Sequence, residues 1–313
     1  MLYVTTRGVN DAFTAHKALT ENVAPDGGMY IPFRLPTFDK DQIEELLSFS
    51  FCECMSAILN RFFPSRLSAW DVETCIGRNP VRLSVAGRKT VIAETWYTPG
   101  VSYEYAVSAL NDKLLGEHRI SICSWVRVAV GIAYLFATYA QMRQNCFIES
   151  GNPFDISVLD GDFTLPAAAL YCAQMGLPIN RVIICSKRNS AIWDLINHGK
   201  IGTSLLLPDQ KIAFERLICI LLGENQVEPY VSACCRHGVY AVPEDAIEYL
   251  QKKLFGAVVG NERIELIISN VSNTNGYKLS SDAAVCFCGV QDYRAKTGQT
   301  GITLVWNSAA PDA

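Results

Sequence analysis

The sequence predicts an α/β fold in which helices cover both faces of a mostly parallel β-sheet. Two observations carry this prediction. Helical and strand-like patterns alternate along the chain, and the strand candidates are short, continuous apolar runs of the kind found in buried parallel strands. The length of 313 residues is compatible with this fold class, because it is enough for one large domain or two ordinary ones. The sequence contains no internal repeat and no low-complexity linker.

The first expected elements are helices. One is predicted over residues 39–51, where Asp39 or Lys40 precedes a run whose apolar residues share one face. The apolar stretch 128–140 is too short to cross a bilayer and predicts a buried helix. A third helix, over 167–175, should end at the glycine and proline that follow it.

Three strands are expected in the second half of the chain. The run 181–186 is a short apolar segment of the buried, parallel type, and 264–269 and 302–306 are two further candidates. A helical pattern over 282–296 separates the last two. The centre of the predicted α/β domain is therefore residues 119–313.

The charge balance excludes some classes of partner. The chain has 27 Lys and Arg against 31 Asp and Glu, for a net charge of −4, and it has no basic run. It therefore lacks the electrostatic footprint of a protein that binds nucleic acid or an anionic membrane surface. The opening residues resemble neither a signal peptide nor a transit peptide, so we expect a cytoplasmic protein.

The cysteines do not predict a metal site. All twelve lie outside C-x-x-C spacing, and the four histidines never pair at ligand spacing. Most of these thiols stand among aliphatic residues, where a free cysteine behaves as a small hydrophobe. Asp160 and Asp162 flank a glycine and could hold a cation or act as a base, but carboxylates there more often form turns. No phosphate loop, dinucleotide fingerprint, nucleophile elbow or zinc-protease motif is present.

Longer matches give a more specific result. In their order along the chain, several segments resemble threonine synthases, beginning with an entry sequence close to YxSTRG and APDGGLYVP. Other matches cover that family's GNFGD loop, MGLPI turn, NFERLL segment, DPHTAVG segment and closing TAHPA. The segments that carry the resemblance are 3–8, 24–32, 161–189, 214–217, 280–285 and 308–311.

This resemblance implies fold type II of the pyridoxal-phosphate enzymes, the tryptophan synthase β-like fold, with the cofactor between a large and a smaller domain. In the family, a lysine in a motif close to HGPTxAFKD forms the Schiff base with the cofactor. The similar segment here is 97–105, in which Pro99 and Tyr103 keep the register. That register places Glu104 where the lysine should be, so we expect no catalytic residue at this position.

The remnant of the cofactor loop is also altered. The family's GNFGD loop binds the cofactor phosphate through backbone N–H groups, and the corresponding residues here are Gly161, Asp162, Phe163 and Thr164. Asp162 would place a carboxylate beside the phosphate. The hydroxyl expected near the pyridine nitrogen corresponds to Ser308. Binding of pyridoxal phosphate at these residues is therefore doubtful, and we expect no cofactor to be present.

A length difference points to a lost domain. Only residues 116–121 stand where the family has most of its smaller domain, so we expect that domain to be largely deleted. The expected organisation is a threonine synthase-like amino-terminal region over 1–95, a remnant of the lysine-motif segment over 96–118, and the main α/β domain over 119–313.

Three functions remain open at this point. The first is a threonine synthase-like protein without threonine synthase activity that acts as a binding or interaction scaffold. The second is a pyridoxal-phosphate-dependent lyase that acts on phosphohomoserine or a related amino acid through another lysine, Lys113 or Lys187. The third is a different enzyme that uses Glu104, Asp160 and Asp162 as acid, base or cation ligands.

Two structural expectations follow from the resemblance. In the family, the corresponding segments line the cleft between the domains, so Glu104, Asp162 and Ser308 should still converge if the scaffold is kept. Without the smaller domain, Tyr97, Tyr103 and Tyr105 should lose their cover, and a homodimer through segment 96–105 would bury them again. Any small-molecule ligand is left unidentified by the sequence.

Overall fold

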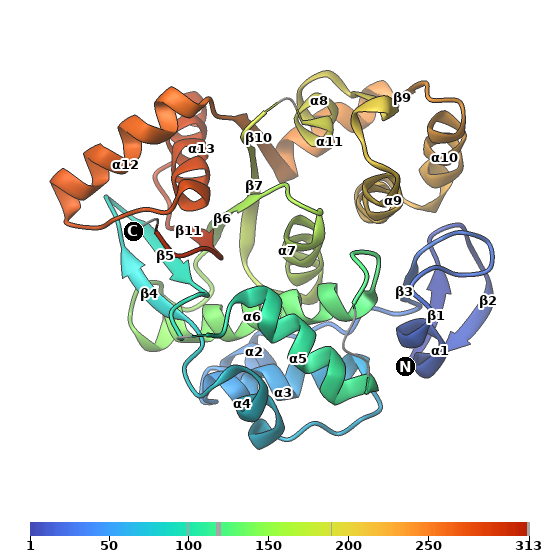
Figure 1. Ribbon diagram of the computed structural model, residues 1–313, viewed down its shortest axis with the longest axis horizontal. Coiled ribbons are helices and arrows are strands. Elements are labelled where there is room, and N and C mark those ends of the chain that lie inside the picture. Colours follow the sequence, from blue (N-terminus) through green and yellow to red (C-terminus); the bar gives the residue numbers. More distant parts are fainter. Residues whose placement is uncertain (99, 117–119, 189, 312–313) are drawn as a thin grey trace.

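The computed structural model describes residues 1–98, 100–116, 120–188 and 190–311. Its centre is a sheet that has six strands among these residues, in the order β10-β7-β6-β11-β5-β4 (Figure 1). All neighbouring pairs are parallel except β4 and β5, which are antiparallel. The strands are β4 Arg82–Val85, β5 Thr90–Glu94, β6 Phe154–Leu159, β7 Ile179–Ser186, β10 Leu254–Val258 and β11 Thr303–Asn307.

Helices cover both faces of this sheet. On one face α13 packs directly against the strands and α12 packs on α13, while α6 and α7 lie on the opposite face with α8 and α11 (Figure 1). The helices are α1 Ala15–Thr20, α2 Lys40–Leu46, α3 Phe51–Phe62, α4 Ala69–Ile76, α5 Tyr103–Leu115, α6 Trp125–Gln144, α7 Thr164–Met175, α8 Ala191–His198, α9 Pro208–Leu222, α10 Val227–Cys235, α11 Glu244–Lys253, α12 Asn261–Asn275 and α13 Ser281–Thr297. Two 3₁₀ turns, η1 Thr203–Leu205 and η2 Glu224–Gln226, flank α9.

Alternation along the strands creates two separate cores. In β7, Val182 and Ile184 pack on the α6 and α7 side, whereas Ile183 and Cys185 pack on the α12 and α13 side. All four side chains are buried, which is why this strand reads as a continuous apolar run. The predicted mostly parallel α/β architecture is confirmed.

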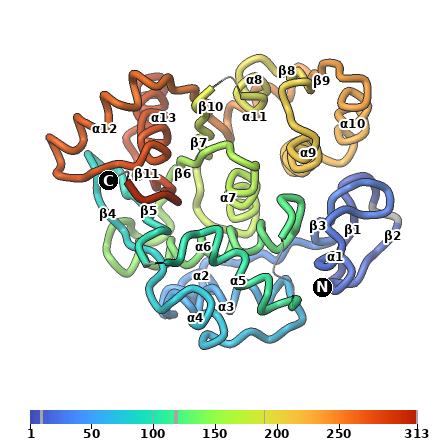
Figure 2. The backbone as a smooth tube through the Cα atoms, viewed as in Figure 1, coloured from blue at the N-terminus to red at the C-terminus, as the bar shows by residue number. Residues whose placement is uncertain are grey.

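Among the described residues, two smaller sheets accompany the central one. The amino-terminal sheet has the order β2-β1-β3 and consists of β1 Leu2–Thr5, β2 Gly8–Thr14 and β3 Tyr30–Pro32. It lies at the edge of the molecule, next to α9 and α10 (Figure 2). Strands β8 Lys200–Gly202 and β9 Val239–Ala241 form the other sheet, an antiparallel pair.

Most of the predicted elements are confirmed. The buried helix over 128–140 is part of α6, and the helix over 167–175 is part of α7, which ends at Gly176 with a φ of 116°. An added Cβ at Gly176 would lie 2.4 Å from the carbonyl oxygen of Phe38, so glycine is required there. Strands β7 and β11 and helix α13 occupy the positions predicted for them.

Two predicted elements were wrong. The helix expected over 39–51 is two helices, because α2 ends at Leu46 and Ser50 begins α3 with its own capping box. The strand expected over 264–269 is part of helix α12, whose buried residues Ile264, Ile267 and Val271 follow helical spacing. The strand of that region is β10, which the sequence analysis missed.

The segment between α5 and α6 is short. Among its described residues, 116 and 120–124, there is no helix or strand. Residues 117–119 of the short segment 116–121 lie outside the described residues, as does Pro99 of the lysine-motif segment. The division at residues 95 and 118 stays a prediction, although β4 and β5 precede residue 96 and belong to the same sheet as the later strands.

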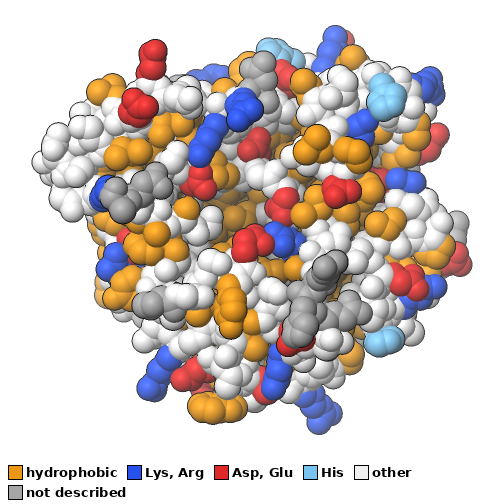
Figure 3. All heavy atoms as spheres, in the orientation of Figure 1, with side chains coloured by type: hydrophobic (Ala, Val, Ile, Leu, Met, Phe, Trp, Pro, Cys, Tyr) orange, Lys and Arg blue, Asp and Glu red, His pale blue; other side chains and the backbone are white. Residues whose placement is uncertain are grey.

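The surface mixes charges of both signs. Figure 3 shows acidic and basic side chains interspersed with apolar ones on the face drawn. Within the part of the chain that the structure describes, no helix has the length and apolar character that a membrane crossing needs. The cytoplasmic location stays a prediction.

Candidate functional site

The topology brings three loops to one edge of the sheet. Strands β5, β11 and β6 are parallel neighbours, so their carboxyl ends lie at the same edge. The chain leads from β5 to Glu104 at the start of α5, from β6 to the loop 160–163, and from β11 to Ser308. Crevices at such edges are where open α/β sheets bind ligands.

A buried arginine joins two of these loops. Nη2 of Arg127 lies 2.8 Å from Oε1 of Glu104 and 2.9 Å from Oδ2 of Asp162. The Arg127 side chain is 9% exposed, whereas Glu104 is 65% and Asp162 28% exposed. The expected convergence of Glu104 and Asp162 is therefore found, and a cation holds the two carboxylates together.

The environment of this cluster favours the charged arginine. Burial lowers the pKa of Arg127, but the hydrogen bond to Glu104 and the charges of Asp162 and Glu104 outweigh it and raise the pKa above its ordinary value. For the neighbouring Tyr103 phenol, burial acts in the other direction and raises the pKa far above its ordinary value. Both groups thus stay protonated at neutral pH.

Three backbone N–H groups of the loop before α7 donate to acceptors within the loop. The N–H of Gly161 donates to Oδ1 of Asp160 at 2.9 Å, and the N–H of Phe163 donates to the carbonyl of Asp160 at 2.7 Å. The N–H of Thr164 donates to Oδ1 of Asp162 at 3.0 Å. Phe163 has a φ of 64°, which completes a tight turn. A phosphate group at this loop would have to displace the two carboxylates.

Other donors beside the loop are free within the described chain. Oη of Tyr103, Nε of Arg127 and Oγ1 of Thr164 are buried without a hydrogen-bond partner among the described residues. Unpaired buried donors suit an anionic group such as a phosphate. Pyridoxal phosphate therefore fits this site in part. Arg127 and Thr164 could hold its phosphate, while Glu104 supplies no amine and Asp162 adds a negative charge.

The remaining predicted residues are placed differently. Ser308 is half-buried beyond β11, and no described contact links it to Glu104 or Asp162. Tyr103 is 3% exposed and packs edge-on against Tyr134 and Trp306, so the prediction that it loses its cover was wrong. Its ring fills the space between α5 and α6, which needs no smaller domain above it.

Asp160 has a structural role. Its Oδ2 accepts hydrogen bonds from the hydroxyls of Ser186, at 2.6 Å, and Ser190, at 2.8 Å, which join the ends of β6 and β7. Among the described residues there is no group of three His, Cys, Asp or Glu side chains that could hold a metal ion. These contacts give no specific support to the acid, base or cation roles considered for Asp160.

The two alternative lysines lie in ion pairs. Nζ of Lys113 is 2.7 Å from Asp71 on α4, and Nζ of Lys187 is 2.8 Å from Asp282 on α13. Lys187 also lines a cavity of about 330 Å³ with Asp160 and Gly161. It follows β7, which β6 and β11 separate from β5, so it approaches the loop from the side opposite Glu104.

Sequence reasoning missed Arg127 as a site residue. The signal for it is a single cation at the start of helix α6, directly before the apolar run 128–140. A lone buried arginine needs a partner, because an unpaired buried charge is costly.

Comparison with known proteins gives the family context. The model for the threonine synthase N terminus matches residues 2–79. Threonine synthase-like 1 from Mus musculus is 33% identical over 104 residues, 33% of this chain and 13% of that protein. The human protein of the same name is 25% identical over 179 residues, 52% of this chain and 23% of that protein. The matched part thus spans less than a quarter of either relative.

Solved structures extend the likeness to the whole fold. Pyridoxal-phosphate-bound threonine synthase from Brucella melitensis has a TM-score of 0.80 at 18% identity, covering 99% of this chain and 89% of that one. Yeast threonine synthase has the same TM-score at 16% identity, covering 99% and 87%. The fold is therefore fold type II.

The Brucella structure also corrects the expectation that no cofactor is present. That enzyme, which shares this fold, holds pyridoxal phosphate. Residues 2–79 of this chain are thus similar to the threonine synthase N terminus, and its fold as a whole is similar to that of threonine synthases, pyridoxal-phosphate enzymes of fold type II.

Proposed function

We propose that this chain uses the threonine synthase fold as a binding scaffold and does not release threonine from phosphohomoserine. The observation that carries the proposal is the carboxylate of Glu104, which by its motif stands at the family's lysine position and pairs with Arg127 at 2.8 Å. A carboxylate cannot form the covalent link to an aldehyde that a lysine forms. The proposal concerns turnover and does not require that pyridoxal phosphate be absent.

The surroundings of Glu104 support a binding role. Arg127 is 9% exposed and has an unpaired Nε, and the hydroxyls of Tyr103 and Thr164 are buried without partners among the described residues. These three donors would be satisfied by a small anionic ligand. Asp162 also pairs with Arg127, so a ligand would compete with a carboxylate of the protein.

An activity assay tests the proposal. The full chain, incubated with pyridoxal phosphate and phosphohomoserine, should release no threonine or phosphate above a protein-free blank, while an active threonine synthase in the same buffer does. The variant Glu104→Lys should also be inactive, because Asp162 still faces Arg127. Turnover by the unmodified chain would overturn the proposal, and turnover by the variant alone would show that Glu104 is the single lesion.

One observation favours the lyase as a second candidate. Lys187 lines the cavity of about 330 Å³ that also contains Asp160 and Gly161 of the loop. Borohydride reduction of the chain with pyridoxal phosphate, followed by peptide mapping, would identify a covalently bound lysine. A single adduct at Lys187, together with turnover that Lys187→Met abolishes, would support the lyase, and Lys113→Met is the matched control.

A further inference from the structure

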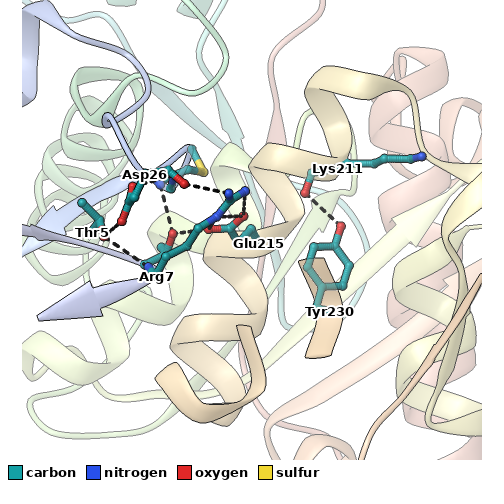
Figure 4. Close-up of polar contacts among 9 residues, drawn as sticks. Thr5, Arg7, Asp26, Lys211, Glu215 and Tyr230 are labelled. Carbon is teal, nitrogen blue, oxygen red and sulfur yellow. Dashed lines mark hydrogen bonds and ion pairs between the residues drawn. The ribbon is translucent and has the colours of Figure 1, made fainter. Parts of the chain in front are cut away.

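A second cavity is lined by none of the residues discussed above as site residues. It has a volume of about 240 Å³, opens to the surface, and is lined by the loop after β1 and by helices α9 and α10. Figure 4 shows Arg7, Glu215 and Tyr230 of this region, which come from these three elements. The lining residues are Arg7, Pro208, Lys211, Ile212, Glu215, Tyr230, Val231, Cys234 and Cys235.

The walls of the cavity are mostly apolar. Pro208, Ile212 and Val231 contribute aliphatic surface, and Tyr230 contributes an aromatic ring. The Tyr230 hydroxyl is already used, because it donates to the carbonyl oxygen of Lys211 at 2.9 Å (Figure 4). Surface of this kind favours a hydrocarbon group over a fully polar ligand.

Arg7 supplies the polar end. Its Nε–H is shared by both oxygens of Glu215, its Nη2 donates to Oε2 at 2.8 Å, and its Nη1 donates to the carbonyl of Asp26 at 2.9 Å. A guanidinium has five N–H groups, so these bonds leave one N–H on each Nη. The side chain is 29% exposed, and it lines the cavity.

The charges of the lining favour an anion. Arg7 and Lys211 are cations, whereas Glu215 is the one carboxylate in the lining and is 1% exposed. Glu215 is committed to Arg7 and to the hydroxyl of Thr6. The side chain of Lys211 points away from Arg7 (Figure 4). Its amine lies 3.4 Å from Nδ1 of His237. The accessible charge of the cavity is therefore positive.

We propose that this cavity is a binding site for a small organic anion with an apolar body. Its carboxylate accepts the two remaining N–H groups of Arg7, in the fork geometry that guanidinium offers. Its hydrocarbon part packs against Ile212, Val231 and the ring of Tyr230. The site is independent of the proposed function, since no residue of it belongs to the Glu104, Arg127 and Asp162 cluster.

Four probe molecules test this chemistry on the full chain by isothermal titration calorimetry. Hexanoate has both the charge and the chain, acetate has only the charge, hexanol has only the chain, and hexylamine has the chain with the opposite charge. We expect hexanoate to bind at least tenfold more tightly than each of the other three. Equal binding of hexanoate and hexylamine, or no detectable binding of hexanoate at 10 mM, would overturn the proposal.

Substitutions and thiol labelling locate the bound probe. Val231→Trp should fill the cavity and reduce the affinity for hexanoate at least tenfold. The control Lys187→Met removes a charge from the cavity of about 330 Å³ and should leave the affinity for hexanoate unchanged. Bound hexanoate should slow iodoacetamide alkylation of Cys235 but not of Cys146, which is also exposed. Full affinity in Val231→Trp, or equal protection of both thiols, would show that hexanoate binds elsewhere.

Discussion

The ion pair between Arg7 and Glu215 should stabilise the docking of the amino-terminal sheet on α9. Arg7→Met would leave the Glu215 carboxylate, 1% exposed, with the Thr6 hydroxyl as its described donor. Removing one partner of a buried ion pair costs about 3–5 kcal/mol, because the remaining charge is uncompensated. Since Arg7 is itself 29% exposed, water can reach the site, and we expect the lower end, about 3 kcal/mol.

A second substitution separates charge from shape. Glu215→Gln keeps an acceptor for Thr6 and leaves Arg7, which water can solvate, so its cost should be about 1–2 kcal/mol. The double variant Arg7→Met with Glu215→Met removes both charges and should be more stable than Arg7→Met alone. Lys187→Met, which breaks a pair whose side chains are 40% and 32% exposed, is the control and should change stability by less than about 0.5 kcal/mol.

Urea unfolding followed by circular dichroism measures these differences, provided that the slope with denaturant stays the same in all variants. The reasoning would be refuted if Glu215→Gln destabilised the protein more than Arg7→Met. It would also be refuted if the double variant were no more stable than Arg7→Met, because the penalty would then not come from an unpaired charge.

Three further outcomes are expected. Asp162→Ala should cost about 2 kcal/mol, because it removes a turn acceptor and an ion pair, whereas Glu104→Gln, 65% exposed, should stay within about 0.5 kcal/mol in the same assay. Burial raises the pKa of Cys52 from 9.0 to about 11 and that of Cys54 to about 12, so the unfolded chain holds fewer protons above pH 9. These two thiols should therefore make the urea midpoint fall between pH 9 and pH 11, whereas they leave it unchanged between pH 7 and pH 8. For the expected homodimer, Tyr105→Glu should weaken self-association in light scattering, and a monomer at high concentration before mutation would exclude it.

Secondary structure could be predicted from the sequence where a local pattern is compatible with one kind of element. The glycine and proline after α7 end that helix, and the apolar runs of β7 and β11 are buried strands as predicted. The run 264–269 failed because a short apolar stretch fits a strand or a buried helix face equally well. The buried set Ile264, Ile267 and Val271 becomes visible as a helix only when the window extends past residue 269.

The candidate site was predictable only in part, for a related reason. Family motifs located Glu104 and the loop with Asp162, and the strand order brought them together. Arg127, which lies between them, belongs to α6, and no local sequence pattern predicts which carboxylates a buried arginine contacts. The same holds for Arg7 and Glu215, whose motifs were both noticed although their contact was not. Pairings between distant segments are a property of the folded chain.

The position of β11 has a consequence for how the protein is made. This strand lies between β5 and β6, and Thr303 pairs with Thr90 on one side and Asp155 on the other. The backbone N–H and C=O groups on the facing edges of β5 and β6 therefore have no strand partner until β11 has been synthesised. Exposed strand edges recruit other chains, and long-range parallel pairing is slow. Until β11 inserts, the facing edges of β5 and β6 therefore remain open to pairing with other chains.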